Sequence, residues 1–322
     1  MRCYPDYMIH LVAGESARGT LEQTSIPGEK LSIDDILMEG PVIDGLRSES
    51  AWSERAEYLE RFFSIPKADY VSGKPERDRI LSESLSHDEI VLWFEFDLFC
   101  QANLMYYLDW YASRDLGAAR LMLICPETFP GKPNFRGLGE LFENELESLF
   151  PQRTEVTAEQ KHIAQRAWQV FSDEDPRAIE RFIRSDTSPL PLVAPAWRAH
   201  LERFPSTANG LGVVPQKTLE AIQSQPLPFG KLFHVVNSTP ELFRHGMGDL
   251  QLQAYLDMLS SGPVPLVQEE GAVEITAAGQ AVLQNRLDAI EANGIDIWYG
   301  GVHLTPANVW RWDVGQQEVK KL

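Results

Sequence analysis

The chain has 322 residues, 43% of them hydrophobic, so it can bury sizeable cores and is expected to form about two domains. Its formal net charge of −18 disfavours nonspecific binding to nucleic acid or anionic lipid, and its three cysteines form no Cys-x-x-Cys pair for zinc. The first residues lack a signal-peptide core, and no apolar run reaches the roughly 20 residues that span a bilayer. We therefore expect a soluble cytoplasmic protein without membrane contact.

Short apolar strands alternate with helical patterns in the first part of the chain. Strands are expected at Met8–Ala13, Lys30–Ile33, Glu89–Phe94 and Arg120–Cys125, and helices at Ser50–Phe63 and Leu98–Tyr111. Strands separated by helices pair in parallel through right-handed crossovers. Residues 1–150 are therefore predicted to form an α/β domain with a mostly parallel, Rossmann-like sheet and flanking helices, which binds a ligand.

The pattern changes near residue 156, where helical spacing replaces the strands. Helices are expected at Thr157–Phe171, Pro176–Arg184, Pro191–Phe204 and Pro215–Ser224. Proline and Asp-Pro start signals separate these helices. Residues 151–240 are therefore predicted to be a helical region.

The last stretch, residues 241–322, has a third pattern. A helix at Asp249–Leu259 is followed by a hairpin of Pro265–Val267 with Val273–Ile275, and then by a helix at Thr276–Asn285. This order is typical of a winged-helix-like unit. The stretch holds five Lys or Arg against eleven Asp or Glu. Because phosphate contacts need a basic face, a protein partner or packing within the chain is favoured over nucleic acid.

Gly14-x-Ser16-x-x-Gly19 follows the first strand and leads into a helix. Glycines allow backbone N–H groups to approach an anion, so Gly14, Glu15, Ser16 and Gly19 are candidate ligand-binding residues. The Glu15 carboxylate would repel a phosphate unless a cation lies between them. The alternative is an ordinary strand-to-helix turn in which Ser16 caps the helix.

Two carboxylates, Glu95 and Asp97, come directly after the most apolar strand. In extended geometry residues two apart point the same way, so the pair could hold Mg²⁺ or serve as a catalytic acid and base. The alternative is that Asp97 caps the next helix while Glu95 lies in a surface loop. Gln101 is a candidate ligand-binding residue near that helix start, although such amides more often bond backbone.

Further charged residues are weaker candidates. Asp34, Asp35 and Glu39 could complete a metal site, but an acidic turn of this kind is more often solvated. Arg47 and Arg77 are the basic residues expected to meet an anionic ligand, because arginine binds phosphate or carboxylate in a bidentate manner. The alternative is that both arginines face water.

A serine hydrolase is disfavoured. Gly14-Glu-Ser16 and Gly301-Val-His303 resemble the two blocks of one esterase class, but Gly300 stands where that class needs an aspartate. His303 is therefore interpreted as structural. The histidines show no zinc-binding spacing.

Several of these segments together resemble a known bacterial family. They are Ile9–Leu21, Gly40-Pro41, Ile90–Gln101 and Phe135-Arg-Gly-Leu-Gly139. The chain resembles the family named domain of unknown function 1835 over residues 8–150. Its helical region and its tail with Gly300–Leu304 are similar to the regions C-terminal to that domain in many members. The resemblance implies the architecture above and no established reaction. Glu15 stands where members usually have aspartate, Phe96 where some have histidine, and Cys100 where some have aspartate.

These patterns support two hypotheses of function. The first is a small-ligand site for a phosphorylated or nucleotide-like compound, Mg²⁺-assisted, at the C-terminal edge of the first sheet. The second is a regulatory or interaction protein, in which an α/β sensor acts on a winged-helix-like output region. The sequence leaves open whether the protein is an enzyme.

Overall fold

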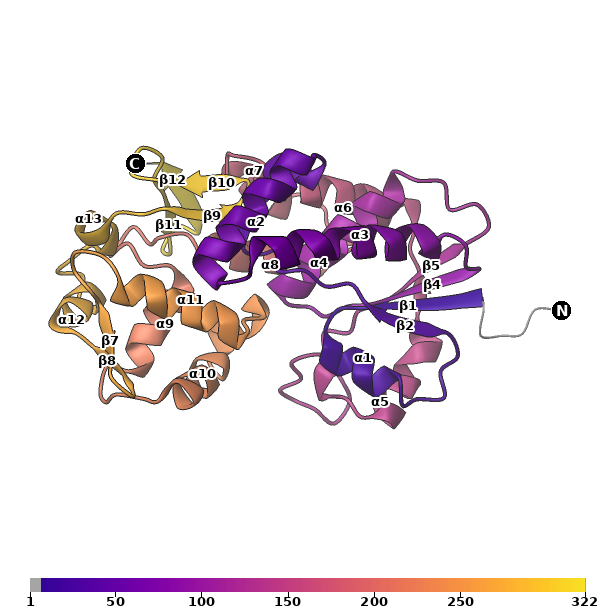
Figure 1. Ribbon diagram of the computed structural model, residues 1–322, viewed down its shortest axis with the longest axis horizontal. Coiled ribbons are helices and arrows are strands. Elements are labelled where there is room, and N and C mark those ends of the chain that lie inside the picture. The colour runs from indigo at the N-terminus through magenta and orange to yellow at the C-terminus, as the bar shows by residue number, and fades with distance from the viewer. Residues whose placement is uncertain (1–6, 322) are drawn as a thin grey trace. The chain divides into compact units, whose positions relative to one another are not determined.

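The computed structural model describes residues 7–321 (Figure 1). The chain divides into two compact units, each built from separate stretches. Unit 1 comprises the residues up to Leu37 with Lys67–Gln169 and Asp186–Ala194, and unit 2 comprises Met38–Pro66, Val170–Ser185 and Pro195 onward. These interleaved units differ from the three consecutive regions expected from the sequence. Cys3 lies outside the described residues.

Unit 1 is built on a five-stranded sheet with the strand order β2-β1-β4-β5-β6. The strands are β1 (Met8–Val12), β2 (Glu29–Ser32), β4 (Glu89–Trp93), β5 (Arg120–Ile124) and β6 (Thr154–Glu155). The first four run parallel, and β6 pairs antiparallel with β5. The four strands expected from sequence are thus present, and with β6 the sheet is mixed.

Helices cover both faces of this sheet. On one side lie α1 (Glu15–Leu21) and α5 (Glu143–Leu149), and on the other α3 (Lys67–Ser84) and α4 (Leu98–Ala112) (Figure 1). The remaining elements of unit 1 are the short helices η3 (Leu138–Glu140) and η4 (Phe150–Gln152), and α6 (Ala158–Phe171). Val91 and Trp93 join the core beneath α1 and α5, whereas Phe94 contacts Tyr107 of α4. Apolar contact on both faces explains why the sequence is continuously apolar from Ile90 to Phe94.

Unit 2 is mainly helical with small sheets. Its helices are α2 (Glu49–Phe63), α7 (Arg177–Ile183), α8 (Val193–Glu202), α9 (Val213–Ala221), α10 (Phe229–Asn237), α11 (Asp249–Ser260), α12 (Ala277–Leu283), α13 (Ala289–Asn293) and the short η2 (Ile43–Leu46) and η5 (Pro240–His245). Its strands are β3 (Gly40–Pro41), β7 (Val267–Glu269), β8 (Val273–Ile275), β9 (Ile297–Gly300), β10 (Val302–Leu304), β11 (Trp310–Asp313) and β12 (Glu318–Lys321). The strands form a β10-β9-β3 sheet and the pairs β7-β8 and β11-β12.

The expected α/β class is confirmed, and so are the helices after residue 156 and the order α11, β7-β8 hairpin, α12.

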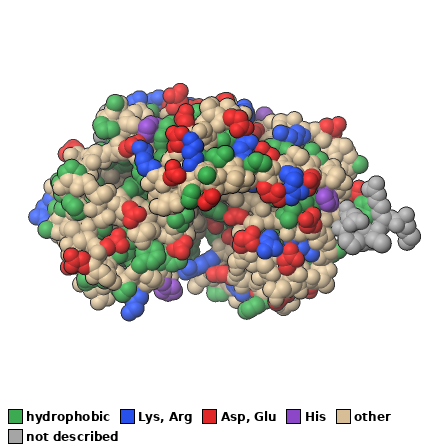
Figure 2. Space-filling view, viewed as in Figure 1, with side chains coloured by type: hydrophobic (Ala, Val, Ile, Leu, Met, Phe, Trp, Pro, Cys, Tyr) green, Lys and Arg blue, Asp and Glu red, His purple; other side chains and the backbone are tan. Residues whose placement is uncertain are grey.

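In the part of the chain that the structure describes, no helix is both long and apolar enough to cross a membrane. Acidic and basic side chains are interspersed on the face drawn in the space-filling view (Figure 2).

Candidate functional site

The ends of β1 and β4 lie side by side at one edge of the sheet in unit 1. Val12 is in register with Trp93, and the Ala13 amide donates to the Trp93 carbonyl at 2.9 Å. From β1 the chain continues to β2 on one side, while β4 lies on the other side. In open α/β sheets, ligands bind where the strand order reverses in this way. The loops after β1 and β4 therefore occupy the edge at which a ligand is expected.

Glu95 leaves the end of β4 and is held by a glycine loop from η3. The Gly139 amide donates to Glu95 Oε1 at 3.3 Å. A Cβ atom on Gly137 would lie 2.3 Å from the Glu95 carboxyl carbon, and its φ of 152° also disfavours other residues. Gly137 is thus required for the close approach of this loop to the carboxylate.

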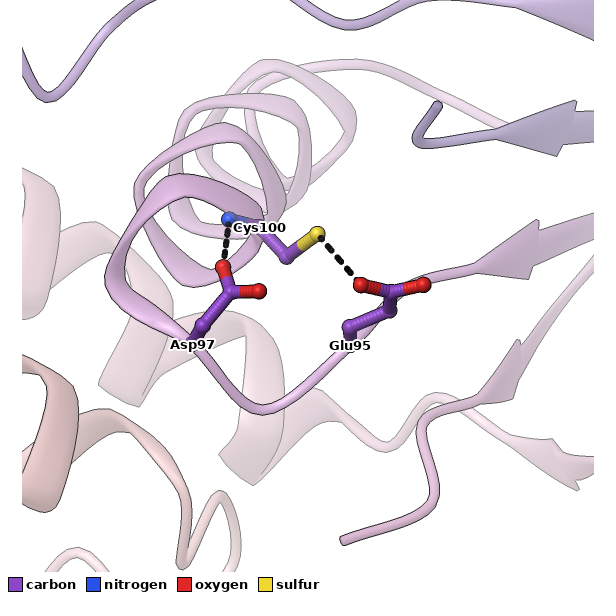
Figure 3. Close-up of side chains that lie close together, drawn as sticks. All are labelled: Glu95, Asp97 and Cys100. Carbon is purple, nitrogen blue, oxygen red and sulfur yellow. Dashed lines mark hydrogen bonds between the residues drawn. The ribbon is translucent and has the colours of Figure 1, made fainter. Parts of the chain in front are cut away.

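Asp97 begins α4, as the capping alternative predicted. Its side chain accepts from the Cys100 amide at 2.8 Å, and it is buried, with 6% exposure. Cys100 lies between the two carboxylates, with its Sγ atom 3.9 Å from Glu95 Oε2 (Figure 3). The cap orients Asp97 and brings a thiol from the first turn of α4 to Glu95.

The two carboxyl groups share a poorly solvated environment. Burial, and then the Asp97 charge, raise the pKa of Glu95 to about 8, while burial raises the pKa of Asp97 to about 6. The pair therefore keeps a proton to a higher pH than ordinary carboxyl groups do. Such a pair can donate and accept a proton in turn, or can exchange its proton for a cation.

The cluster of Glu95, Asp97 and Cys100 could also bind a metal ion. One ligand atom from each residue lies within 4.8 Å of the others. Mg²⁺ prefers oxygen ligands, so the two carboxylates fit it, whereas Cys100 does not. Burial and the nearby carboxylates raise the pKa of the Cys100 thiol, which keeps its proton. A metal here would be held by Glu95 and Asp97 and would displace any proton that the pair holds.

Of the residues after β1, Ser16 reaches this cluster through Gly139. Ser16 Oγ donates to the Gly139 carbonyl at 3.3 Å, and the amide of the same glycine donates to Glu95. Gly14, with φ of 97°, is the N-cap residue of α1. The alternative that Ser16 caps this helix is wrong, because Ser16 lies within α1 and α1 has no side-chain cap.

Glu15 and Gly19 lie in α1 itself. Glu15 is exposed and pairs with Arg18 at 2.8 Å. Gly19 belongs to the helix rather than to the preceding loop, so the expected Gly14–Gly19 loop is shorter than predicted.

Gln101 is buried and supports the backbone after β4. Its Nε2 atom donates to the Glu95 carbonyl at 2.7 Å and to Cys125 Sγ at 3.4 Å. This agrees with the alternative that the amide bonds backbone. Sequence reasoning missed Gly137, Gly139 and Cys100 as neighbours of Glu95, although Phe135–Gly139 was among the segments that carry the family resemblance.

The remaining charged candidates lie elsewhere. Arg77 forms an ion pair of 3.1 Å with Asp35, and Tyr70 donates to the same carboxylate at 2.7 Å. Arg47 is exposed and belongs to unit 2. The expectation of a solvated acidic turn is wrong for Asp35 and Glu39, which are 7% and 2% exposed, because each is paired with a buried or half-buried arginine.

Comparison of the chain with protein-family models gives no match, and comparison with curated proteins gives none either. The resemblance to domain of unknown function 1835 therefore stays a prediction, and any functional conclusion depends on the geometry of the site.

Proposed function

We propose that unit 1 binds a small polar ligand at the edge between β1 and β4, with Glu95 and Asp97 as its reactive or cation-binding pair. The observation that carries the proposal is a half-buried and a buried carboxyl group, with ligand atoms within 4.8 Å of each other, where the strand order reverses. Burial raises the pKa of both groups, which agrees with this role. Perturbed carboxyl groups of this kind cluster at functional sites more often than elsewhere. The parallel part of the sheet would then serve as a Rossmann-like frame for the ligand.

The ligand class is limited by the charge of this edge. Two carboxylates repel a bare phosphate, so a phosphorylated or nucleotide-like ligand would bind together with Mg²⁺ held by Glu95 and Asp97. Mg²⁺ would supply the positive charge that joins phosphate to carboxylate. Without a cation, the protonated Glu95 would instead donate to the ligand while Asp97 accepts. The Gly139 amide occupies Oε1 of Glu95, so Oε2, which faces Cys100, is the oxygen that would bind the ligand or cation.

The test is binding of MgCl₂, of ADP, and of both together, measured by calorimetry and thermal shift. A native-state ligand at 100 times its Kd stabilises the fold by about 2.7 kcal/mol. Glu95→Gln, which copies the protonated side chain but cannot ionise, is expected to abolish the Mg²⁺-dependent signal. The control is Glu159→Gln, an exposed change in α6. Wild-type protein that binds neither probe, or Glu95→Gln that binds both unchanged, contradicts the proposal.

A second readout is independent of the ligand. Because folding raises the pKa of Glu95, its stabilising contribution is present below pH about 4.5 and is lost as the pH rises toward 8. Glu95→Gln should remove this loss and unfold at a higher urea concentration than wild type at pH 8. Equal pH dependence in the two proteins would mean that Glu95 is ordinarily solvated and not part of a buried pair.

The second candidate is a regulatory protein whose winged-helix-like output region is α11, the β7-β8 hairpin and α12. The order of these elements supports it. The acidic excess in residues 241–322 favours a protein partner over nucleic acid. Salt-sensitive binding of random duplex DNA in a gel-shift assay would contradict this choice of partner.

A further inference from the structure

Unit 2 contains a cavity of about 720 Å³ that the proposed function does not use. It lies among the loop after α8, the end of α11, α13 with the start of β9, and β10. All of these segments belong to unit 2. Pockets that bind small molecules usually measure about 300–1,000 Å³, so the cavity has room for one.

The walls of this cavity are largely apolar. Leu211, Met258, Leu259, Ile290 and Ile297 contribute aliphatic surface from four different segments. Apolar walls favour a ligand that buries hydrocarbon or aromatic surface there.

His303 and Asp296 provide a polar group on the cavity lining. His303 Nε2 lies 2.8 Å from Asp296 Oδ1, and its ring stacks on Trp298 at 4.3 Å with an interplanar angle of 9°. A carboxylate only accepts, so Nε2 carries the hydrogen, and in the uncharged form of the ring Nδ1 is an acceptor. The described residues supply no hydrogen bond to Nδ1. The ring is thus held in place with one acceptor available.

The arginine that lines this cavity and the arginine that pairs with its Asp296 do not favour an anion. Arg203 lines the cavity, but its side chain is fully buried and bonds to the Met38 carbonyl at 2.6 Å and to Glu39. Arg61 pairs with Asp296 at 3.0 Å. Because both guanidinium groups have carboxylate partners, a negatively charged ligand would meet the Asp296 carboxylate without a bare cation to balance it.

We propose that this cavity is a binding site for an uncharged, mainly aromatic small molecule whose hydroxyl or N–H group donates to Nδ1 of His303. The aromatic body fills the apolar walls, and the single donor fixes its orientation. This site is separate from Glu95 and Asp97, which belong to unit 1.

The test uses three fluorescent probes that share one ring system, with the full-length protein. N-phenyl-naphthylamine is neutral and carries one N–H group, its N-methyl derivative lacks the donor, and anilinonaphthalene sulfonate adds a negative charge. Wild type is expected to bind the first about three- to tenfold more tightly than the second, the range for one neutral hydrogen bond. The sulfonate is expected to bind more weakly than the first probe.

Two variants locate the binding. His303→Phe keeps a ring to stack on Trp298 but removes the acceptor, so it should abolish the preference for the N–H probe over its N-methyl derivative. Met258→Trp fills part of the cavity and should weaken both neutral probes at least tenfold. The matched control, His234→Phe, changes an exposed histidine that does not line the cavity, and should bind like wild type.

Several outcomes overturn the proposal. Wild type that does not bind the neutral probes, or binds the sulfonate most tightly, excludes the proposed ligand class. An unchanged N–H preference in His303→Phe excludes the acceptor role. Binding that persists at full strength in Met258→Trp places the probe outside this cavity. The three-probe comparison in wild type decides the ligand class even if a variant fails to fold.

Discussion

At the scale of single residues, Glu39 and Arg203 show how much a sequence pattern omits. The acidic turn before Gly40 looks solvated in the sequence, yet Glu39 is paired with a fully buried arginine from the end of α8. Arg55 also donates to the Glu39 carbonyl at 2.5 Å. Arg203 lies more than a hundred residues away from Glu39 in the chain, so no local pattern predicts the pair. Glu39 is thus paired with an arginine of unit 2 and does not lie near the carboxyl pair of unit 1 as a further metal ligand.

Two buried histidines in unit 2 predict a pH-dependent stability. Burial lowers the pKa of His245 to about 3 and that of His200 well below 6.5, and the Arg203 charge adds to both effects. Near pH 6.5 the unfolded chain binds protons that the folded chain does not bind. The contribution of these two histidines to the free energy of unfolding is therefore present above pH about 6.5. It is lost as the pH falls from there toward 3.

The measurement is the urea midpoint of wild type and His200→Phe between pH 7 and pH 5. Phenylalanine suits the aromatic surroundings, where the His200 ring lies 4.6 Å from that of Phe171. The free energy of unfolding of the variant should depend less steeply on pH than that of wild type, by up to about 1.4 kcal/mol per pH unit. His234→Phe, an exposed change, should leave the slope as in wild type. If His200→Phe and wild type have the same slope, His200 is protonated in the folded protein.

At the scale of elements, local sequence patterns predict individual strands and helices, but they do not predict which distant segments contact one another. The sequence predicts β4 and the start of α4 because apolar residues are contiguous and Asp97 is a strong cap. It also places Glu95 at a strand end. It does not predict that the loop at Gly137 and Gly139 would hold Glu95, because that contact depends on tertiary packing. The sequence therefore indicates Glu95 as a candidate residue. It does not indicate how far Glu95 is buried or which residues surround it.

Helix α3 was also missed, because it is rich in polar residues and contains Pro75. Proline in a helix interior removes a backbone hydrogen bond and costs up to about 3 kcal/mol relative to alanine. Pro75 is exposed, so Pro75→Ala removes little packing and should raise the melting temperature. In the control, Pro195→Ala, the proline occupies the first turn of α8, where the missing N–H has no partner in the helix. The control should change stability less. A lower melting temperature for Pro75→Ala would mean that α3 needs a break at this residue.

At the scale of the whole molecule, each unit is completed by stretches from distant parts of the chain. Residues 241–322 looked like a separate region in sequence. In the structure β9 of this region pairs with β3, and the Trp312 amide donates to the Pro205 carbonyl at 2.8 Å. The sequence could not predict this arrangement, since an apolar pattern shows that a face is buried but not which segment covers it.

A fragment of residues 241–322 is accordingly expected not to fold alone. It lacks β3, α2, α8 and α9, which belong to the same unit. Amide chemical shifts should show narrow dispersion, and urea should give no cooperative transition. The full-length chain under the same conditions is the reference. A well-dispersed spectrum with cooperative unfolding would show that this stretch is an independent domain.

The pairing of β3 with β9 also has a consequence for synthesis on the ribosome. Gly40 and Pro41 pair with Tyr299 and Gly300, roughly 260 residues later, which at 5–20 residues per second is a delay of roughly 13–50 s. Throughout that interval the apolar face of α2, with Trp52, Ala56 and Leu59, emerges before the partners that bury it within unit 2. During translation the apolar face of this helix is therefore the segment that we expect a chaperone for newly made chains to bind.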